Sequence, residues 1–261
     1  MLKLRLRSRN VSLTDRNKEL RVLGIIPARG GSKGVPRKNI RSLCGKPLLS
    51  YTAESARAAK RLTRVILSTE DEEIAEVGKA LGLDVPFMRP VELAQDNTPT
   101  MPVVLHALKS LEEIGETYNA VCLLQPTCPL RRAKDVDGCI ELLERSGADS
   151  VITVLPVPDT YNPKWVYWRS ANGSMALSTG EREPVPRRQD LPPAFHREGS
   201  VYVTRREVLL DHGNLYGTKV QGFEIDAVNS VNIDTFEDWQ EAEQQIQRRM
   251  SFGVSGGRSA G

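Results

Sequence analysis

Short apolar runs rich in β-branched residues alternate with helix-like stretches between Val22 and Val154, and this alternation restricts the possible folds more than any other feature of the chain. Alternating strands and helices are typical of βαβ units, in which parallel strands form one sheet and helices cover both of its faces. We therefore expect an α/β fold with three layers and a mostly parallel sheet. The expected strands cover residues 22–26, 64–68, 120–124 and 150–154, and the expected helices cover 48–60, 72–81, 101–114 and 134–146.

A long interruption of this pattern follows at about residues 156–199, where Pro, Arg, Trp and Tyr replace the helical periodicity. A segment of this length without helices is usually a functional lid or an interface arm. Its aromatic residues Trp165, Tyr167 and Trp168 need a partner surface, so we predict an extended dimerisation arm and a homodimer. The α/β pattern then returns in residues 200–204, 220–224 and 231–233, and a final helix is expected over 235–249.

The length of 261 residues, 39% of them apolar, is enough to bury the core of one domain, which we place at residues 21–250. We expect residues 1–20 to form a basic, flexible extension and the Gly/Ser-rich residues 251–261 to form a disordered tail. Residues 1–21 hold seven Lys and Arg against two acidic residues, a local charge of +5, so the net charge of +3 leaves −2 for the remainder. A slightly acidic body predicts no nucleic-acid partner.

No apolar run approaches the roughly 20 residues of a membrane helix, and no secretory signal precedes the first expected strand. We therefore expect a cytoplasmic protein without a membrane partner. The four cysteines form no CxxC pair and the three histidines fall in unrelated segments, which argues against a disulfide framework and a zinc site.

The loop after the first expected strand, residues 27–39, contains three glycines and four cations and no carboxylate. Glycines let backbone N–H groups approach a ligand closely, and the cations Arg29, Lys33, Arg37 and Lys38 supply full positive charges, so the loop is suited to polyphosphate. It matches neither the P-loop nor the dinucleotide-binding fingerprint. A simple turn with solvated cations is the alternative.

Near the C-terminal end, Asn232 and Asp234 alternate with apolar residues, so both side chains lie on one side of an extended segment. Two oxygen ligands on one side suit Mg²⁺, which takes few protein ligands when phosphates and waters complete its shell. Asp234 could instead cap the helix that follows. The presence of a polyphosphate loop in the same chain is what makes a Mg²⁺ site a serious alternative to a helix cap.

Paired arginines occur in the expected arm at Arg187 and Arg188, next to Gln189. Forked hydrogen bonds from guanidinium groups bind carboxylates and phosphates, so this segment is a candidate clamp for an acidic substrate. Lys164, between Pro163 and Trp165, is a weaker candidate of the same kind. Solvated side chains on an arm are the alternative interpretation.

Taken in order, seven motifs resemble the acylneuraminate cytidylyltransferase family over residues 21–249. The motifs are Ala28-Arg29-Gly30-Gly31-Ser32-Lys33-Gly34 with Lys38-Asn39; Ser68-Thr69-Glu70; Arg89-Pro90 through Leu93 and Asp96; Leu124-Gln125-Pro126-Thr127-Cys128-Pro129-Leu130; Arg187-Arg188-Gln189-Asp190; Gly199-Ser200-Val201-Tyr202; and Val231-Asn232-Ile233-Asp234. The resemblance implies a Rossmann-like nucleotide-diphospho-sugar transferase fold. It also implies transfer of CMP from CTP to the anomeric hydroxyl of a nonulosonic (sialic-type) acid, with release of pyrophosphate.

The resemblance assigns roles to individual residues. Arg29, Lys33 and Asp234 become catalytic residues, and Asp234 with Asn232 becomes the site of the expected Mg²⁺ cofactor. The implied nucleotide contacts are Ala28, Arg29, Gly30, Gly31, Ser32, Lys33, Lys38, Asn39, Arg89 and Gln125. The implied sugar contacts are Gln125, Pro126, Thr127, Lys164, Arg188, Gln189 and Tyr202.

The expected mechanism is in-line attack of the sugar hydroxyl on the α-phosphorus, with Mg²⁺ bridging the phosphates and lowering the hydroxyl pKa. Arg29 and Lys33 would stabilise the departing pyrophosphate. Two positions depart from the family pattern: Asn232 stands where an aspartate is usual, and Glu70 stands where aspartate is common. A neutral amide in place of a carboxylate predicts weaker metal binding.

Three other activities stay open. Activation of 3-deoxy-manno-octulosonate shares the fold and the chemistry, although Ser32-Lys33-Gly34 and Lys38-Asn39 favour nine-carbon acids. A pyrophosphorylase that takes a sugar 1-phosphate is the second, and a nucleotide-binding homologue with impaired catalysis, suggested by Asn232, is the third. The sequence does not distinguish among the nonulosonic acids.

Overall fold

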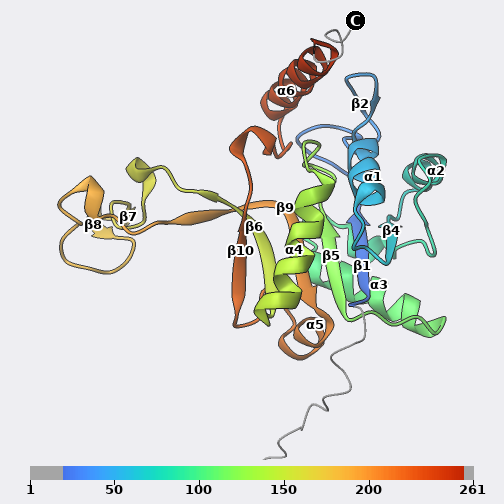
Figure 1. The fold of residues 1–261 in the computed structure, drawn as a ribbon, viewed down its shortest axis with the longest axis horizontal. Coiled ribbons are helices and arrows are strands. Elements are labelled where there is room, and N and C mark those ends of the chain that lie inside the picture. The colour runs from blue at the N-terminus through green and yellow to red at the C-terminus, as the bar shows by residue number, and fades with distance from the viewer. Residues whose placement is uncertain (1–19, 256–261) are drawn as a thin grey trace, which may run out of the picture.

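Six strands form one central sheet in the computed structural model, which describes residues 20–255 (Figure 1). The strands are β1 (Val22–Pro27), β4 (Arg64–Ser68), β5 (Ala120–Leu124), β6 (Ser150–Pro156), β9 (Phe195–Arg205) and β10 (Val220–Glu224), in the spatial order β10-β6-β9-β5-β1-β4. Only β9 among these six runs antiparallel to its neighbours. The expected mostly parallel sheet is confirmed.

Helices cover both faces of this sheet. They are α1 (Leu48–Ala58), α2 (Glu72–Ala80), α3 (Thr100–Glu113), α4 (Ala133–Ser146), α5 (Arg206–His212) and α6 (Phe236–Ser255). Along β1, Val22 and Ile26 pack with residues of α1, α2 and α4, whereas Leu23 and Ile25 face α3 and α5. Successive side chains of a strand point to opposite faces, so a strand apolar at every position requires cover on both sides. The three-layer fold is therefore confirmed.

Three details differ from the sequence-based expectations. Residues 231–233 form no strand, because Val231 and Ile233 pack against α6 and the segment makes no sheet ladder. The short helix α5 was not expected at all. Helix α6 continues to Ser255, whereas we expected a tail from residue 251. Residues 251–255 contain a single glycine, which costs a helix only about 1 kcal/mol. The rest of the expected tail and the basic extension up to residue 19 lie outside the described residues.

A third apolar cluster lies beyond the end of the sheet, where α6 packs against two segments that are far apart in the sequence. Val35 of the loop after β1 is fully buried there with Val231, Ile233 and Trp239. This cluster joins the glycine-rich loop to the segment that contains Asn232 and Asp234. The packing of α6 thus fixes the position of two of the predicted functional segments.

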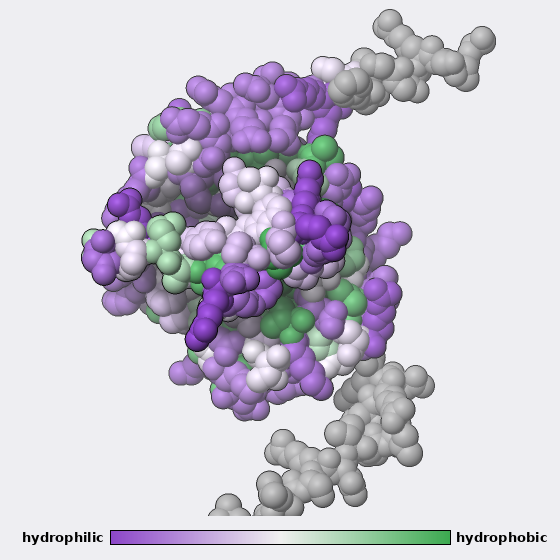
Figure 2. All heavy atoms as spheres, turned by 90° about the vertical axis from the view of Figure 1, so that its left-hand side faces the viewer, coloured by the Kyte–Doolittle hydropathy of each residue, from purple (hydrophilic) through white to green (hydrophobic). Residues whose placement is uncertain are grey.

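Between β6 and β9 the chain leaves the body as an arm, which carries the small hairpin of β7 (Tyr167–Arg169) and β8 (Met175–Leu177) (Figure 1). A second small hairpin, β2 (Ser42–Leu43) with β3 (Lys46–Pro47), precedes α1. Figure 2 faces the arm and shows mostly hydrophilic atoms with scattered apolar patches. No helix within residues 20–255 is long and apolar enough to cross a membrane.

Candidate active site

Two adjoining clefts open at the carboxyl ends of the parallel strands, where α/β sheets bind their ligands. The first cleft, of about 250 Å³, is lined by Arg29, Gly31, Ser32, Lys38, Asn39 and Arg89 among others. The second cleft, of about 670 Å³, is lined by Arg197, Tyr202, Tyr216, Asn232 and Asp234 among others. Thr100, Gln125 and Thr127 line both, so a ligand in the first cleft and a ligand in the second would meet at these residues.

The glycine-rich loop is held in place by short-range contacts on both sides. The Asn39 side-chain amide donates to the Arg29 carbonyl oxygen at 2.9 Å, which closes the loop on itself. A Cβ atom on Gly34 would lie 1.9 Å from the Asp234 carbonyl oxygen, so only glycine allows this approach of the two backbones. Asp234 is thereby placed next to the loop, although almost 200 residues separate the two segments.

Cations of this loop contact carboxylates. The Asp96 carboxylate forms two ion pairs, one with Arg29 Nη1 at 2.9 Å and one with Lys33 Nζ at 2.8 Å. The hydrogen bond from Lys33, followed by the charges of Lys33 and Arg29, holds the pKa of Asp96 below its usual range. Arg29 lines the first cleft, while Lys33 lies on its exposed rim and does not line it.

Lys38 lies deeper than the other loop cations. Its ammonium group donates to the Ile233 carbonyl oxygen at 2.6 Å and lies 3.2 Å from Asp234 Oδ1. Lys38 therefore contacts both clefts at once, because it lines the first and pairs with a carboxylate of the second.

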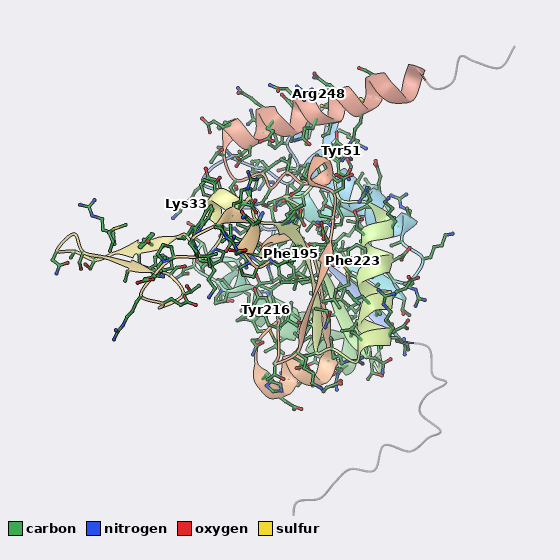
Figure 3. The ribbon with its side chains drawn as sticks, turned by 60° about the vertical axis from the view of Figure 1, so that its left-hand side comes forward. Lys33, Tyr51, Phe195, Tyr216, Phe223 and Arg248 are labelled. Carbon is green, nitrogen blue, oxygen red and sulfur yellow. The ribbon has the colours of Figure 1, made fainter. Side chains whose placement is uncertain are left out.

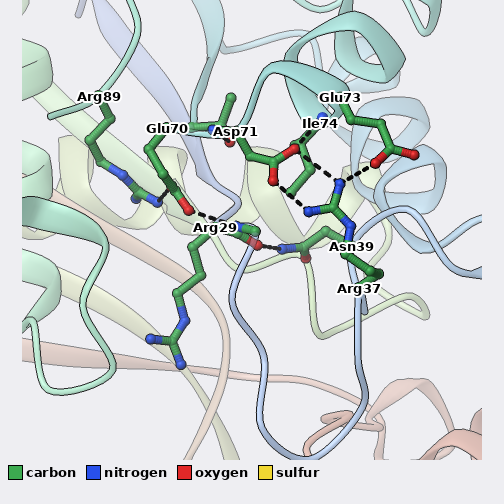
Figure 4. Close-up of polar contacts among 10 residues, drawn as sticks. Arg29, Arg37, Asn39, Glu70, Asp71, Glu73, Ile74 and Arg89 are labelled. Atoms are coloured by element: carbon green, nitrogen blue, oxygen red, sulfur yellow. Dashed lines mark hydrogen bonds and ion pairs between the residues drawn. The ribbon is translucent and has the colours of Figure 1, made fainter. Parts of the chain in front are cut away.

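Three residues of the loop do not act as the sequence suggested, and Figure 4 shows one of them, Arg37, with the carboxylates that it contacts. Ala28 is buried in the core and its N–H donates to the Ser68 carbonyl oxygen, while the Gly30 N–H donates to Glu70 at 2.7 Å. Neither N–H group is free for a phosphate. Arg37 turns away from the clefts and pairs with carboxylates next to α2, so it supplies no charge to the candidate phosphate site. Gly31 and Ser32 do face the first cleft as expected.

Glu70 and Arg89 form a buried ion pair at the first cleft, with a distance of 2.6 Å between Oε2 and Nη2. Glu70 also accepts the Gly30 N–H, so it connects Arg89 to the glycine-rich loop. The buried Arg89 Nε has no hydrogen-bond partner among the described residues. A buried donor without a partner is rare in proteins, and this one lies on a residue that lines the first cleft.

Arg131 lies behind the two clefts and was not predicted from the sequence. Its guanidinium group is fully buried, and burial lowers its pKa. It donates to the carbonyl oxygens of Gln125 and Ser200 and to the Thr52 hydroxyl. Since Gln125 lines both clefts, Arg131 fixes the backbone where they meet.

Asn232 and Asp234 point to the same side, as the sequence predicted. The Asn232 amide nitrogen donates to Asp234 Oδ2 at 2.8 Å. The described residues contain no group of three His, Cys, Asp or Glu side chains able to hold a metal ion. An amide oxygen and a carboxylate fit Mg²⁺ as a partial shell, provided that the Asn232 amide turns its oxygen toward the ion and that phosphates and waters supply the remaining ligands.

Residues of the arm do not reach the clefts of their own chain. Lys164 pairs with Glu181, and Arg188 Nε lies 2.5 Å from Asp159. Gln189 follows in a short 3₁₀ turn, and none of Lys164, Arg188 and Gln189 lines either cleft. The arm projects away from the body, whereas Lys33 and Tyr216 lie on the body, on the side from which the arm leaves (Figure 3). Pro126, Thr127 and Tyr202, the other predicted sugar contacts, do line the clefts.

Comparison with known proteins shows the family to which the chain belongs. The model of the family described as cytidylyltransferase matches residues 23–250. The chain belongs to the cytidylyltransferase family. It is a nucleotidyltransferase, and the resemblance to acylneuraminate cytidylyltransferases is confirmed by its relatives.

Two curated relatives have similar identity to the chain and different names. CMP-N,N'-diacetyllegionaminic acid synthase of Legionella pneumophila is 30% identical over 84% of this chain and 94% of the relative. N-acylneuraminate cytidylyltransferase A of Danio rerio is 32% identical over 94% of this chain, and the match spans 55% of that longer protein. A solved structure of CMP:2-keto-3-deoxy-manno-octonic acid synthetase with CTP shares the fold, with a TM-score of 0.66, 18% identity, and coverage of 88% of this chain and 99% of that one.

The buried Glu70–Arg89 pair leads to a testable prediction. We expect Glu70→Gln to lower the free energy of unfolding by about 3 kcal/mol, because removing one charge of a buried pair leaves the other uncompensated. Urea denaturation measures this. The matched control is Glu73→Gln, whose carboxylate pairs with Arg37 at an exposed position, and we expect a change within about 1 kcal/mol there. Equal effects of the two substitutions would contradict the role given to Glu70.

Proposed function

We propose that the protein transfers CMP from CTP to the anomeric hydroxyl of a nonulosonic acid and releases pyrophosphate. The observation that carries this proposal is the pair of adjoining clefts, which share Gln125 and Thr127. The first has the cations for a triphosphate, and the second has the volume and polar groups for a sugar acid. The names of the two curated relatives, both enzymes that form CMP derivatives of nonulosonic acids, support the same reaction.

The reaction needs alignment and charge neutralisation more than a protein nucleophile. The sugar hydroxyl attacks the α-phosphorus, the bond from this phosphorus to the pyrophosphate oxygen breaks, and the hydroxyl proton passes to solvent water. Arg29 and Lys33 bind the phosphates that leave as pyrophosphate, exchanging Asp96 for phosphate oxygens. Arg89 and Asn39 also line the first cleft and hold the nucleotide there.

Asp234 and Asn232 are the residues that we propose to hold Mg²⁺ against the phosphates. When bound, the ion would supply positive charge to the phosphate oxygens and to the attacking hydroxyl. Lys38 lies 3.2 Å from Asp234 and keeps this carboxylate at the junction of the two clefts. Asn232 adds an oxygen without adding a charge, so binding of the ion relies more strongly on the phosphates than it would with two carboxylates.

The identity of the sugar acid that receives CMP is a separate question. Similar identities to relatives named for two different nonulosonic acids do not select one of them. Activation of 3-deoxy-manno-octulosonate is the second candidate, because a synthetase named for this type of acid has the same fold. A shared fold does not identify the substrate. The motifs Ser32-Lys33-Gly34 and Lys38-Asn39 favour a nine-carbon acid over the eight-carbon one.

Pyrophosphate release tests the activity directly. With CTP and Mg²⁺, we expect release with at least one acid of a panel of N-acetylneuraminate, legionaminate, pseudaminate and 3-deoxy-manno-octulosonate. A sugar 1-phosphate is the control substrate and should give none. Release with the sugar 1-phosphate alone would replace the proposal by a pyrophosphorylase activity, and CTP binding without turnover of any acid would indicate a homologue that has lost catalysis.

The Asn232 amide gives a second prediction. We expect Asn232→Asp to lower the Mg²⁺ concentration needed for half-maximal pyrophosphate release about tenfold, because a carboxylate replaces a neutral ligand. Isothermal titration of Mg²⁺ into the complex with CTP should show the same shift. Asn214→Asp is the control, since Asn214 lines the second cleft outside the proposed ion site. An unchanged Mg²⁺ dependence would contradict the assignment of Asn232.

The arm supports a homodimer. Trp168, Tyr161 and Met175 are 70%, 67% and 57% exposed, a large apolar area for a single projecting segment. The family resemblance implies that the arm reaches toward the site of a partner subunit, where Arg188 and Gln189 would then lie. The four cysteines are free, which suits a reducing compartment such as the cytoplasm, where we place the reaction.

Sedimentation equilibrium at micromolar concentration measures the state of association. We expect the mass of two chains for the wild type and a shift toward one chain for Trp168→Ser. Arg145→Ser, an exposed change on α4, is the control and should leave the dimer intact. A wild type with the mass of one chain would rule out the dimer.

A further inference from the structure

The second cleft has an uneven set of charges. Glu198 and Asp234 contribute carboxylates, and Arg197 is the one cation among the described residues that line it. If the proposed function holds, a sugar acid brings a further negative charge into this cleft. In a 2-keto sugar acid the carboxylate is bonded directly to the anomeric carbon, so it must lie close to the hydroxyl that reacts. Lys38 already pairs with Asp234, so the incoming carboxylate has no counter-charge in this cleft unless the one cation that lines it supplies one.

A β-bulge brings Arg197 into the second cleft. Ile152 of β6 is opposite Tyr202 and Val154 is opposite Arg197, so one residue of β6 faces four residues of β9, 198–201. An odd number of extra residues reverses the alternation of side chains along a strand. Arg197 and Tyr202, five positions apart, therefore share one face, and both line the second cleft.

Hydrogen bonds build the bulge and keep it in this shape. Glu198 accepts the Ser200 N–H at 2.9 Å and the hydroxyl of Ser230 at 3.1 Å, which ties β9 to the segment of Asn232. Thr153 of β6 accepts the Val201 N–H at 3.1 Å. Gly199 adopts φ +102, a conformation that favours glycine. Arg197 is thus presented by a specified backbone and not by a flexible loop.

The guanidinium group of Arg197 is oriented and still has donors to offer. Its Nη1 donates to the Tyr216 hydroxyl at 3.2 Å, and Tyr216 packs edge-to-face on Tyr202 with ring centroids 6.4 Å apart. None of the ion pairs within the described residues involves Arg197. A guanidinium group has five N–H donors in a planar fork, which matches the two oxygens of a carboxylate.

We propose that Arg197 binds the carboxylate of the sugar acid and thereby sets the preference of the second cleft for acidic sugars. This inference rests on the proposed function. It assigns the carboxylate to a residue of the same chain as the clefts, in contrast to Arg188 of the arm, which pairs with Asp159 away from both of them.

Steady-state kinetics of three variants tests the assignment. For Arg197→Gln we expect the KM for the acid to rise about 10- to 100-fold, the loss expected for a charge-assisted hydrogen bond, with the KM for CTP unchanged. Arg197→Lys should recover part of the loss, because it restores the charge without the fork. The control Arg145→Gln, on α4, should behave as the wild type. Thermal unfolding and CTP titration confirm that each variant is folded.

A neutral substrate separates charge recognition from a general disturbance of the cleft. The carboxamide of the best acid lacks the negative charge, so the wild type should prefer the acid over the amide about 10-fold or more, and Arg197→Gln should lose that preference. A preference that survives in Arg197→Gln overturns the inference. Selective loss in Arg188→Gln instead assigns the carboxylate to the arm of a partner subunit and overturns it as well. If the wild type turns over no acid of the panel, the proposed function fails first.

Discussion

The close approach of Gly34 to the Asp234 backbone is the contact on which the rest of the site depends. A Cβ atom at Gly34 would lie 1.9 Å from the Asp234 carbonyl oxygen, and Lys38 four residues later donates to the neighbouring Ile233 carbonyl at 2.6 Å. Val35, between them, is buried against α6 together with Ile233. One short loop thus makes a steric, an electrostatic and an apolar contact with the same segment, and this triple contact joins the glycine-rich loop of the first cleft to the segment that lines the second.

Electrostatics organises the clefts before any ligand is bound. Asp96 forms ion pairs with both Arg29 and Lys33, Glu70 forms one with Arg89, and these ion pairs lie beside the first cleft. The pairs differ in exposure, and this difference separates their roles. Arg89 is buried and the Glu70 side chain is only 13% exposed, so this ion pair holds Arg89 in a fixed position. Asp96 is open to water, so its ion pairs are weak enough for phosphate oxygens to replace the carboxylate when a triphosphate enters.

Apolar periodicity predicted the sheet well, because strands buried on both faces leave an unmistakable run of apolar residues, as in β1 and β5. The family resemblance assigned Lys38, Asn39, Gln125 and Asp234 to one site, and all four line the two adjoining clefts. The sequence could not predict which groups the backbone N–H donors bond to, or the direction in which long side chains point. The Gly30 N–H donates its hydrogen bond to Glu70. Arg37 has a positive φ of 55°, and its side chain pairs with Asp71 at the start of α2. Arg197 was missed because simple alternation places it opposite to Tyr202, and only the bulge reverses that placement.

The amide at Asn232 changes the charge that the junction of the two clefts must balance. Lys38 and Asp234 form a neutral pair, and Asn232 adds a hydrogen bond to the same carboxylate without adding charge. With a second carboxylate at this position, one negative charge would remain without a partner, and the two carboxylates would repel each other at hydrogen-bonding distance until a cation bound. In this chain the Asp234 carboxylate already has Lys38 as its counter-charge, so no metal ion is needed to balance it. If the proposed Mg²⁺ binds here, its charge would serve the bound triphosphate more than the assembly of the site.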